Sequence, residues 1–366
     1  VSLNNEELVC PGSPVNISGI VLFRNNTPVI DAIVNISIYD ISNNIVDSIT
    51  IHTNSTGHYT YSWIVTDAGE YNIDITVCDS SRTRFGFNNS EFIGAKGVIK
   101  VGILDSWGAD AYQAYTVFPS IEHKWYEYGV YKIVFDAESL NKENITLLDI
   151  VDSSADVLFI SNAIDSWYGW EFTDEEIRAI KSFVFAGHGV IGTGGTLASN
   201  IGGLAEIFGY SNSTLGNWSV EFNKIFEILN DSHPLFEGIV PPYDTGINIT
   251  IADLTYDSTS PPNVLAKSTD NLAEIVEHRY GNGMAIYLTH IPELYYPAYG
   301  YTPTYEDMKV IYNSIIWVFE QSEPVSYEVV VQEVEVSPLV GSGETIYINA
   351  TIVNIGNKSI SSTTAR

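Results

Sequence analysis

The pattern of apolar residues changes twice along the chain and predicts its division into domains. Residues 1 to about 97 carry short stretches of alternating apolar and polar residues, typical of strands with one buried face. From Gly97 on, apolar runs alternate with segments of helical periodicity, which indicates βαβ units and a mostly parallel sheet. Alternation returns after residue 323. We predict a β-sandwich (1–97), an α/β domain (98–322) and a partial β-sandwich (323–366).

Local signals place the elements of the α/β domain. Thr173 and Thr304 each stand three residues before an acidic residue and so predict capped helix starts. The phrase Tyr280-Gly281-Asn282-Gly283 predicts a hairpin turn. Buried strands are expected at Val98–Leu104, Tyr131–Phe135, Asp156–Ile160 and Gly189–Thr193.

N-glycosylation acceptors are unusually frequent, with twelve Asn-X-Ser/Thr sites where chance placement would give roughly five. Several acceptors alternate with apolar strand residues and are therefore expected on outer faces. The excess predicts an exported glycoprotein. The acceptors are Asn16, Asn25, Asn35, Asn54, Asn88, Asn144, Asn212, Asn217, Asn230, Asn248, Asn349 and Asn357.

The charge balance excludes nucleic acid as a partner. Sixteen Lys and Arg against 45 Asp and Glu give a net charge of -29, which repels a phosphate backbone. Ca²⁺ is the cation that such a surface could bind, with Asp105, Asp110, Asp165 and Asp174 as candidate ligands, although a solvated acidic surface with diffuse counterions is the simpler explanation of the charge. The seven histidines lack zinc spacing, so no cofactor and no transition metal is expected.

The two cysteines, Cys10 and Cys78, are predicted to form a disulfide because exported proteins usually oxidise such pairs. Alternation along Tyr71 to Val77 points Cys78 outward, so the segment around Cys10 is expected to cross the outside of that strand. Two free thiols are the alternative. No apolar run is long enough to span a membrane, and Val1 is interpreted as a trimmed N-terminus, with any signal peptide or anchor outside these residues.

Ligands of parallel α/β sheets bind beyond the carboxyl ends of the strands. The residues expected there are Asp105 and Ser106, Ser161 and Asn162, the run Gly192-Thr193-Gly194-Gly195-Thr196, and His290 with Glu293. The glycine run could hold an anion on backbone N–H groups. It lacks the lysine of a phosphate loop, so a tight strand-to-helix turn explains it better.

An ordered set of phrases resembles the class I glutamine amidotransferase-like fold, in particular its ThuA-like and β-galactosidase-trimerisation-like branches. The phrases are Asp156–Ser161, Phe172–Glu176 through Phe185–Ile191, His233–Gly238, Tyr280–Gly283 and a closing helix with Asn313 and Trp317. The resemblance implies a nucleophilic Cys at the turn, or elbow, that follows the expected strand Gly189–Thr193, where this chain has Gly194. It also implies a His-X-Glu pair, of which His290 and Glu293 are a degenerate echo.

Without a thiol the amidotransferase reaction is excluded in this domain. A secreted hydrolase remains an alternative if Thr193, Thr196 or Ser199 lies within hydrogen-bond reach of His290 or His188. A second alternative is sugar binding or adhesion through two aromatic loops, because exposed rings stack on sugars and partners. Packing over the core would explain these loops as well. The candidates are Trp167, Tyr168, Trp170, Tyr295, Tyr296 and Tyr299.

Two further resemblances flank the α/β domain. The spacing of Gly19, Pro28, Gly57 and Gly69 resembles the carboxypeptidase-regulatory-like or transthyretin-like sandwich. The segment from Val334 to Asn357 resembles the start of a cell-adhesion-related (CARDB-type) β-domain of microbial surface proteins. These features together predict a non-enzymatic extracellular subunit of an archaeal cell-surface assembly, such as a surface layer, sheath or filament. Its edge strands are expected to pair with copies of itself or with other surface proteins.

Overall fold

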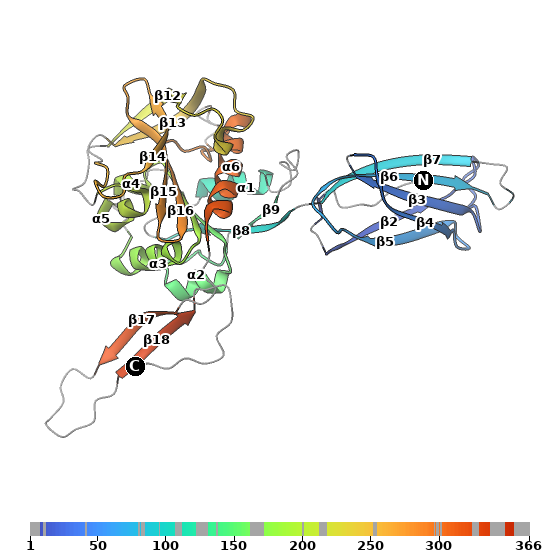
Figure 1. The fold of residues 1–366 in the computed structure, drawn as a ribbon, viewed down its shortest axis with the longest axis horizontal. Helices are drawn as coiled ribbons and strands as arrows, with labels where there is room; N and C mark the ends of the chain where they lie inside the picture. The colour runs from blue at the N-terminus through green and yellow to red at the C-terminus, as the bar shows by residue number, and fades with distance from the viewer. Residues whose placement is uncertain are drawn as a thin grey trace. The chain divides into compact units, whose positions relative to one another are not determined.

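The computed structural model describes residues 8–354 except 10–11, 41, 80, 82–84, 95, 107–111, 122–130, 137, 162–171, 200, 212–217, 252–254, 296, 298–299, 301, 324–328 and 337–347. The fold is mostly β and divides into two compact units (Figure 1). One unit comprises Val1–Val98 with Glu122–Ile133, and the other Ile99–Ile121 with Val134–Arg366. Among the described residues, no helix is long and apolar enough to cross a membrane.

The first unit is a sandwich of two unequal sheets. Its strands are β1 (Leu8–Val9), β2 (Pro14–Ile20), β3 (Ile33–Asp40), β4 (Ile45–His52), β5 (His58–Ile64), β6 (Gly69–Cys78) and β7 (Phe85–Gly94). One sheet has the order β1-β7-β6-β3-β4, and β2 and β5 form the other. Apolar residues at every second position of β2, β3, β5 and β6 fill the space between the sheets, and Trp63 meets Tyr71 edge to face across it.

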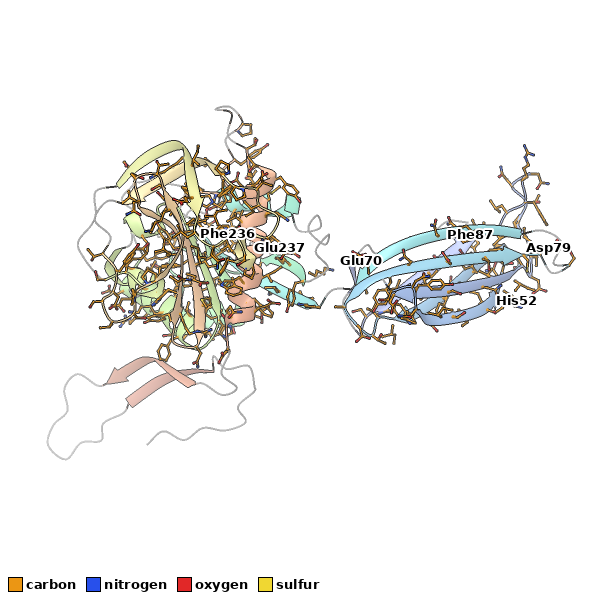
Figure 2. All side chains as sticks on the ribbon, turned by 45° about the horizontal axis from the view of Figure 1, so that its top comes forward. His52, Glu70, Asp79, Phe87, Phe236 and Glu237 are labelled. Carbon is orange, nitrogen blue, oxygen red and sulfur yellow. The ribbon has the colours of Figure 1, made fainter. Side chains whose placement is uncertain are left out.

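Only two strands cover the inner face of the five-stranded sheet, and this leaves β7 polar on that side. Asn88 pairs with buried Ile75 and Ser90 pairs with buried Ile73, so both share the face of the core residues. Phe87, on the opposite face, is well exposed (Figure 2). The acceptor Asn88 is therefore half-buried on the inner side of the sheet, contrary to the expectation that acceptors occupy outer faces.

The predicted disulfide between Cys10 and Cys78 is wrong. Cys78 is a free and buried thiol. Cys10 lies outside the described residues, but its sequence neighbour Val9 pairs with Gly94, which in turn pairs with Gly69 at the start of β6. Cys78 ends β6, about 30 Å away at strand spacing, whereas a disulfide requires Cα atoms within about 7 Å. β1 joins the edge of β7 instead of crossing the outside of β6.

The second unit contains a nine-stranded sheet with the order β13-β12-β14-β15-β16-β11-β10-β8-β9. Its strands are β8 (Gly97–Leu104), β9 (Tyr131–Asp136), β10 (Val157–Ile160), β11 (Gly189–Thr193), β12 (Trp218–Ile228), β13 (Tyr243–Ile251), β14 (Asn263–Ser268), β15 (Ala273–Tyr280) and β16 (Gly283–Leu288). The helices are α1 (Tyr112–Ile121), α2 (Leu147–Ser153), α3 (Asp174–Phe185), α4 (Thr196–Ser199), α5 (Ile201–Leu204) and α6 (Tyr305–Gln321), with 3₁₀ turns η2 (Ala205–Phe208) and η3 (Pro234–Phe236).

The predicted parallel sheet is confirmed only in part. β8, β10, β11 and β16 are parallel neighbours, as expected for βαβ units. From β16 outward, β15, β14, β12 and β13 add by antiparallel pairing, so the sheet is mixed. Short hairpin connections explain the antiparallel pairing of β14 with β15 and of β15 with β16, because hairpins can link only antiparallel strands. The Tyr280–Gly283 hairpin itself is confirmed.

Helices cover both faces of this sheet. On one face, Phe118 of α1 meets Phe159 of β10 edge to face, and α6 packs on β11 and β16. On the other, α2, α3, α5 and η2 share an apolar core with β10, β11 and β16. Both predicted capping boxes are confirmed: Thr173 caps α3 with Glu176, and Thr304 caps α6 with Asp307.

The last strands, β17 (Val329–Val336) and β18 (Ile348–Asn354), pair with each other in an antiparallel hairpin. The pairing shifts register between Val331 and Glu333, as one extra residue in β17 requires. Within the described residues this two-stranded sheet has no third strand.

Candidate functional site

The carboxyl ends of the parallel strands bring together most of the residues expected there. Ser161 follows β10, Thr193 ends β11, and His290 and Glu293 lie in the turn after β16. Asp105 follows β8 and forms an isolated bridge with Asn141. Asn162 lies outside the described residues.

Glu293 is the centre of this edge. Its Oε1 accepts hydrogen bonds from the Ser161 hydroxyl at 2.6 Å and from the Thr193 hydroxyl at 2.5 Å. The side chain is 0% exposed, and burial raises its pKa to about 7 against the lowering effect of the two hydroxyls. A carboxyl group of the loop after β16 thus joins the ends of β10 and β11.

His290 belongs to a second, adjoining network. Its Nε2 lies 2.9 Å from the Tyr243 hydroxyl, which donates to Asp307 Oδ1 at 2.6 Å. Because this hydroxyl has only one proton to donate, His290 must donate its Nε2–H to the Tyr243 oxygen. Burial lowers the pKa of His290 to about 3, so the ring stays neutral. The network connects β13, the loop after β16 and the start of α6.

The position of the missing cysteine is held by main-chain hydrogen bonds. Gly194 has a φ of +52°, which favours glycine, and its N–H donates to the carbonyls of Leu288 and His290 at 2.8 and 3.1 Å. Its own carbonyl accepts from the Tyr287 hydroxyl at 2.7 Å. Gly194 therefore forms the tight turn between β11 and α4 that the glycine run predicted, and it offers no nucleophile.

The hydroxyl candidates form no described hydrogen bond with the histidines. Thr193 donates to Glu293, and Thr196 donates to the carbonyls of Ile160 and Thr193 at 3.1 and 2.8 Å. His188 precedes β11 and stacks on Phe183, so it lies at the opposite end of that strand from Thr193. The Ser199 side chain lies outside the described residues.

The aromatic and calcium candidates are only partly covered by the structure. Trp167, Tyr168, Trp170, Tyr296 and Tyr299 lie outside the described residues. Tyr295 is described and is 39% exposed, next to buried Leu294.

Asp110 and Asp165 also lie outside the described residues, and Asp174 starts α3. In the part of the chain that the structure covers, no three His, Cys, Asp or Glu side chains are grouped to hold a metal ion.

Sequence reasoning missed two residues of the site, Tyr243 and Asp307. Asp307 carried a signal as the third residue of a capping box, but only for its helix. Tyr243 carried none, because it reaches the site through the antiparallel strand β13.

The family model of the lacto-N-biose phosphorylase central domain matches residues 100–323. The chain belongs to this family. The lacto-N-biose phosphorylase central domain model begins within β8 and ends just after α6, so it covers the nine-stranded sheet and its helices. No curated protein matches the chain significantly.

Solved structures with similar folds include two ThuA-like proteins. The one from Bacteroides uniformis is 13% identical over 60% of this chain and 91% of its own, with a TM-score of 0.42. The one from Parabacteroides merdae is 11% identical over 61% and 90%, with a TM-score of 0.40. An exo-β-1,4-mannosidase from an Opitutaceae bacterium is 13% identical over 60% of this chain and 36% of its own, with a TM-score of 0.35.

Within this lacto-N-biose phosphorylase central domain, one pair of the sequence phrases forms a contact around η3. His233 caps η3, and its Nε2 lies 3.3 Å from Glu277, which also accepts from the Trp317 indole at 2.6 Å. Asn313 donates to the carbonyls of Leu235 and Glu237, the latter labelled beside Phe236 in Figure 2. The phrases His233–Gly238 and the closing helix are therefore parts of one structural contact.

A second pair of phrases meets at the end of α3. The Asn282 N–H donates to the Phe185 carbonyl at 3.0 Å. A Cβ on Gly283 would lie 2.1 Å from the Val184 carbonyl oxygen and 2.4 Å from that of His188. Glycine at 283 is required because the hairpin turn presses directly on the main chain after α3.

Proposed function

We propose that this chain is a non-enzymatic, extracellular structural subunit of a microbial cell-surface assembly, with an α/β domain that keeps the phosphorylase-family fold without its chemistry. The observation that supports the proposal most strongly is the residue at the turn between β11 and α4, where glycine stands in place of a nucleophile. The Gly194 N–H donates to two main-chain carbonyls and its carbonyl accepts from the Tyr287 hydroxyl, while the Ser161 and Thr193 hydroxyls donate to buried Glu293. The elbow itself thus carries no nucleophilic side chain, and the imidazole of His290 faces Tyr243 and not a hydroxyl of Thr193 or Thr196.

The placement of the acceptor asparagines supports export. Six of the twelve are exposed: Asn16, Asn25, Asn35, Asn54, Asn144 and Asn230. In three of these the acceptor carboxamide oxygen accepts a hydrogen bond from the hydroxyl two residues on, as Asn25 does from Thr27. Asn88 is half-buried, and Asn212, Asn217, Asn357 and the side chains of Asn248 and Asn349 lie outside the described residues.

Open strand edges supply the means of assembly. β4 and β13 end their sheets within the described residues, and β17–β18 is a two-stranded sheet. Such edges offer main-chain donors and acceptors to another chain. In this proposal the N-terminal unit is a transthyretin-like spacer, and β17–β18 begins a CARDB-like domain whose sheet is completed by further strands.

Two measurements on the purified chain test this function. Incubation with lacto-N-biose and inorganic phosphate is expected to release no sugar phosphate, and sedimentation velocity is expected to show species that grow with protein concentration. Phosphorolysis that Glu293→Gln abolishes would refute the non-enzymatic assignment. A single monomeric species at high concentration would refute the assembly.

A second candidate function is sugar binding beside the same sheet edge. It is favoured by the exposure of Tyr295 next to the turn that carries Glu293, and by the disaccharide named for the family. Glycan-array binding that is lost in Tyr295→Ala and Trp170→Ala, but kept in a Tyr256→Ala control, would support it. Absence of binding by the parent chain would remove it.

A further inference from the structure

A buried lysine meets two carboxylates on the antiparallel side of the nine-stranded sheet. Lys224 of β12 has its Nζ 2.8 Å from Glu274 Oε1 and 3.7 Å from Asp270 Oδ1. The side chains of Lys224 and Glu274 are 8% and 1% exposed, whereas Asp270, in the turn between β14 and β15, is 54% exposed. The Thr289 hydroxyl donates to Glu274 Oε2. The four residues form a cluster that no part of the candidate site uses.

The surroundings of this cluster disfavour separated charges. Tyr210 and Tyr287 are buried nearby; burial is the main cause that raises the pKa of each, and the negative charge of Glu274 adds to it. Removing an ammonium and a carboxylate from water costs several kcal/mol per ion, and pairing recovers only part of that cost. A reaction that turns the two ions into a neutral group would remove the cost altogether.

We propose that Lys224 and Glu274 condense to an intramolecular isopeptide bond between Nζ and Cδ. The ion pair contains every atom that the reaction needs. One ammonium proton moves to Asp270, and the resulting amine attacks Cδ, which lies one covalent bond beyond the oxygen that Nζ already contacts. The new C–N bond forms, the bond from Cδ to Oε1 breaks, and Oε1 leaves as water with the proton from Asp270 and a second proton from the nitrogen. No oxidant, reductant or cofactor takes part.

Each neighbour of the pair has a defined role in this step. Thr289 holds Oε2 and stabilises the charge that develops on it, so Oε2 remains as the amide carbonyl oxygen. Asp270 lies on the exposed side of the cluster, where it can pass a proton and where the released water can leave. The contact of Nζ with Oε1 at 2.8 Å holds the nitrogen beside the carboxyl group whose carbon it would attack.

Two other lysine ion pairs among the described residues are less buried. Lys181 and Glu206 lie 2.5 Å apart, but their side chains are 25% and 41% exposed. Lys142 contacts Asp149 with side chains 49% and 19% exposed. Water solvates these ions and would hydrolyse any activated acyl carbon, so these pairs should remain ionic. They serve as internal controls in the same protein.

The bond would tie β12 to β15 across the intervening strand β14. β12 pairs with β14 only at its last three residues, Phe226 to Ile228, and otherwise only with β13. The covalent link would therefore fasten the long β12–β13 ribbon to the sheet at the point where main-chain pairing stops. Such a link resists mechanical or chemical separation of the ribbon.

Mass spectrometry of the full chain, purified without reducing or heating steps from a host that adds no N-glycans, tests the bond. The intact mass is expected to be lower than the sequence mass by one water. A protease digest should contain one branched peptide that joins Lys224 to Glu274, with no branched peptide at Lys181 or Lys142. An intact mass equal to the sequence mass, or loss of water at another site, would overturn the proposal.

Two variants confirm the chemistry. Lys224→Arg keeps the positive charge but cannot form this amide, and it should have the full sequence mass. Glu274→Gln should lose ammonia in place of water, because the leaving group is then the amide nitrogen. Since the parent chain alone decides the outcome, the proposal remains falsifiable even if a variant fails to fold.

Discussion

The Thr193 hydroxyl donates a hydrogen bond to the Glu293 carboxyl group, one hundred residues further along the chain. This contact ties the strand that would present a nucleophile to the loop that would present its base. In a working acyl-transfer site the hydroxyl would face an imidazole. Here the imidazole of His290 faces Tyr243 instead. The Thr193–Glu293 contact therefore joins the end of β11 to the loop after β16 at this edge of the sheet.

Glu293 should make folding stability depend on pH. Its pKa is about 7 in the folded state against 4.5 for the ordinary group, so the folded chain holds the proton more tightly. The contribution of Glu293 to the free energy of unfolding is fully present below pH 4.5. It is lost as pH rises through 7, and the loss is about 3 kcal/mol. Urea unfolding at pH 4 and pH 8 should show this change in the difference between the parent chain and Glu293→Gln. An equal difference at both pH values would contradict it.

His290 should act in the opposite sense. Its folded pKa of about 3 lies below the ordinary 6.5, so its contribution is present above pH 6.5 and lost as pH falls toward 3. Between pH 7.5 and pH 5 the loss should be roughly 2 kcal/mol. The difference in unfolding free energy between the Glu293→Gln variant and the Glu293→Gln/His290→Gln double variant, measured at both pH values, isolates the contribution of His290. The same substitution at exposed His58 is the matched control.

Glycan occupancy should follow exposure. In the chain recovered from its native host, Asn16, Asn25, Asn35, Asn54, Asn144 and Asn230 should carry N-glycans, whereas half-buried Asn88 should be occupied least among the described acceptors of the first unit. Peptide mapping before and after enzymatic deglycosylation measures this. Uniform absence of glycans would remove the main support for export.

Gly283→Ala should destabilise the second unit by roughly 3 kcal/mol, because the new methyl group would overlap the Val184 and His188 carbonyl oxygens. Gly86→Ala is the matched control, since a Cβ there meets nothing within 4 Å. Denaturant unfolding of both variants gives the comparison. A loss for Gly283→Ala no larger than that for Gly86→Ala would show that the hairpin can move away from α3.

Local signals predicted much of this fold. The capping boxes at Thr173 and Thr304, the turn at Gly281 and the predicted strands β8, β9, β10 and β11 each depend on residues close in sequence. The antiparallel extension was missed because the order of strands in a sheet depends on pairing between distant segments. The disulfide failed for the same reason: the strand phase placed Cys78 on the outer face, as its pairing with Phe85 shows, but no local pattern shows which edge β1 joins.

In the candidate site, too, residues with a local sequence signal were predicted and their distant partners were not. Gly194, His290 and Glu293 could be found because they follow strands whose carboxyl ends must meet. Their partners could not be assigned. Tyr243 reaches Asp307 across 64 residues, and Lys224 reaches Glu274 through an antiparallel strand order that the sequence did not reveal.

The Gly281–Gly283 turn fits closely against the end of α3. Asn313 in turn bridges the closing helix to the carbonyls of Leu235 and Glu237 at η3. Both contacts lie in the skeleton of the domain, and neither touches the elbow at Gly194. These sequence motifs therefore report the architecture of the domain. Chains that share them will share this fold, whatever residue stands at the elbow.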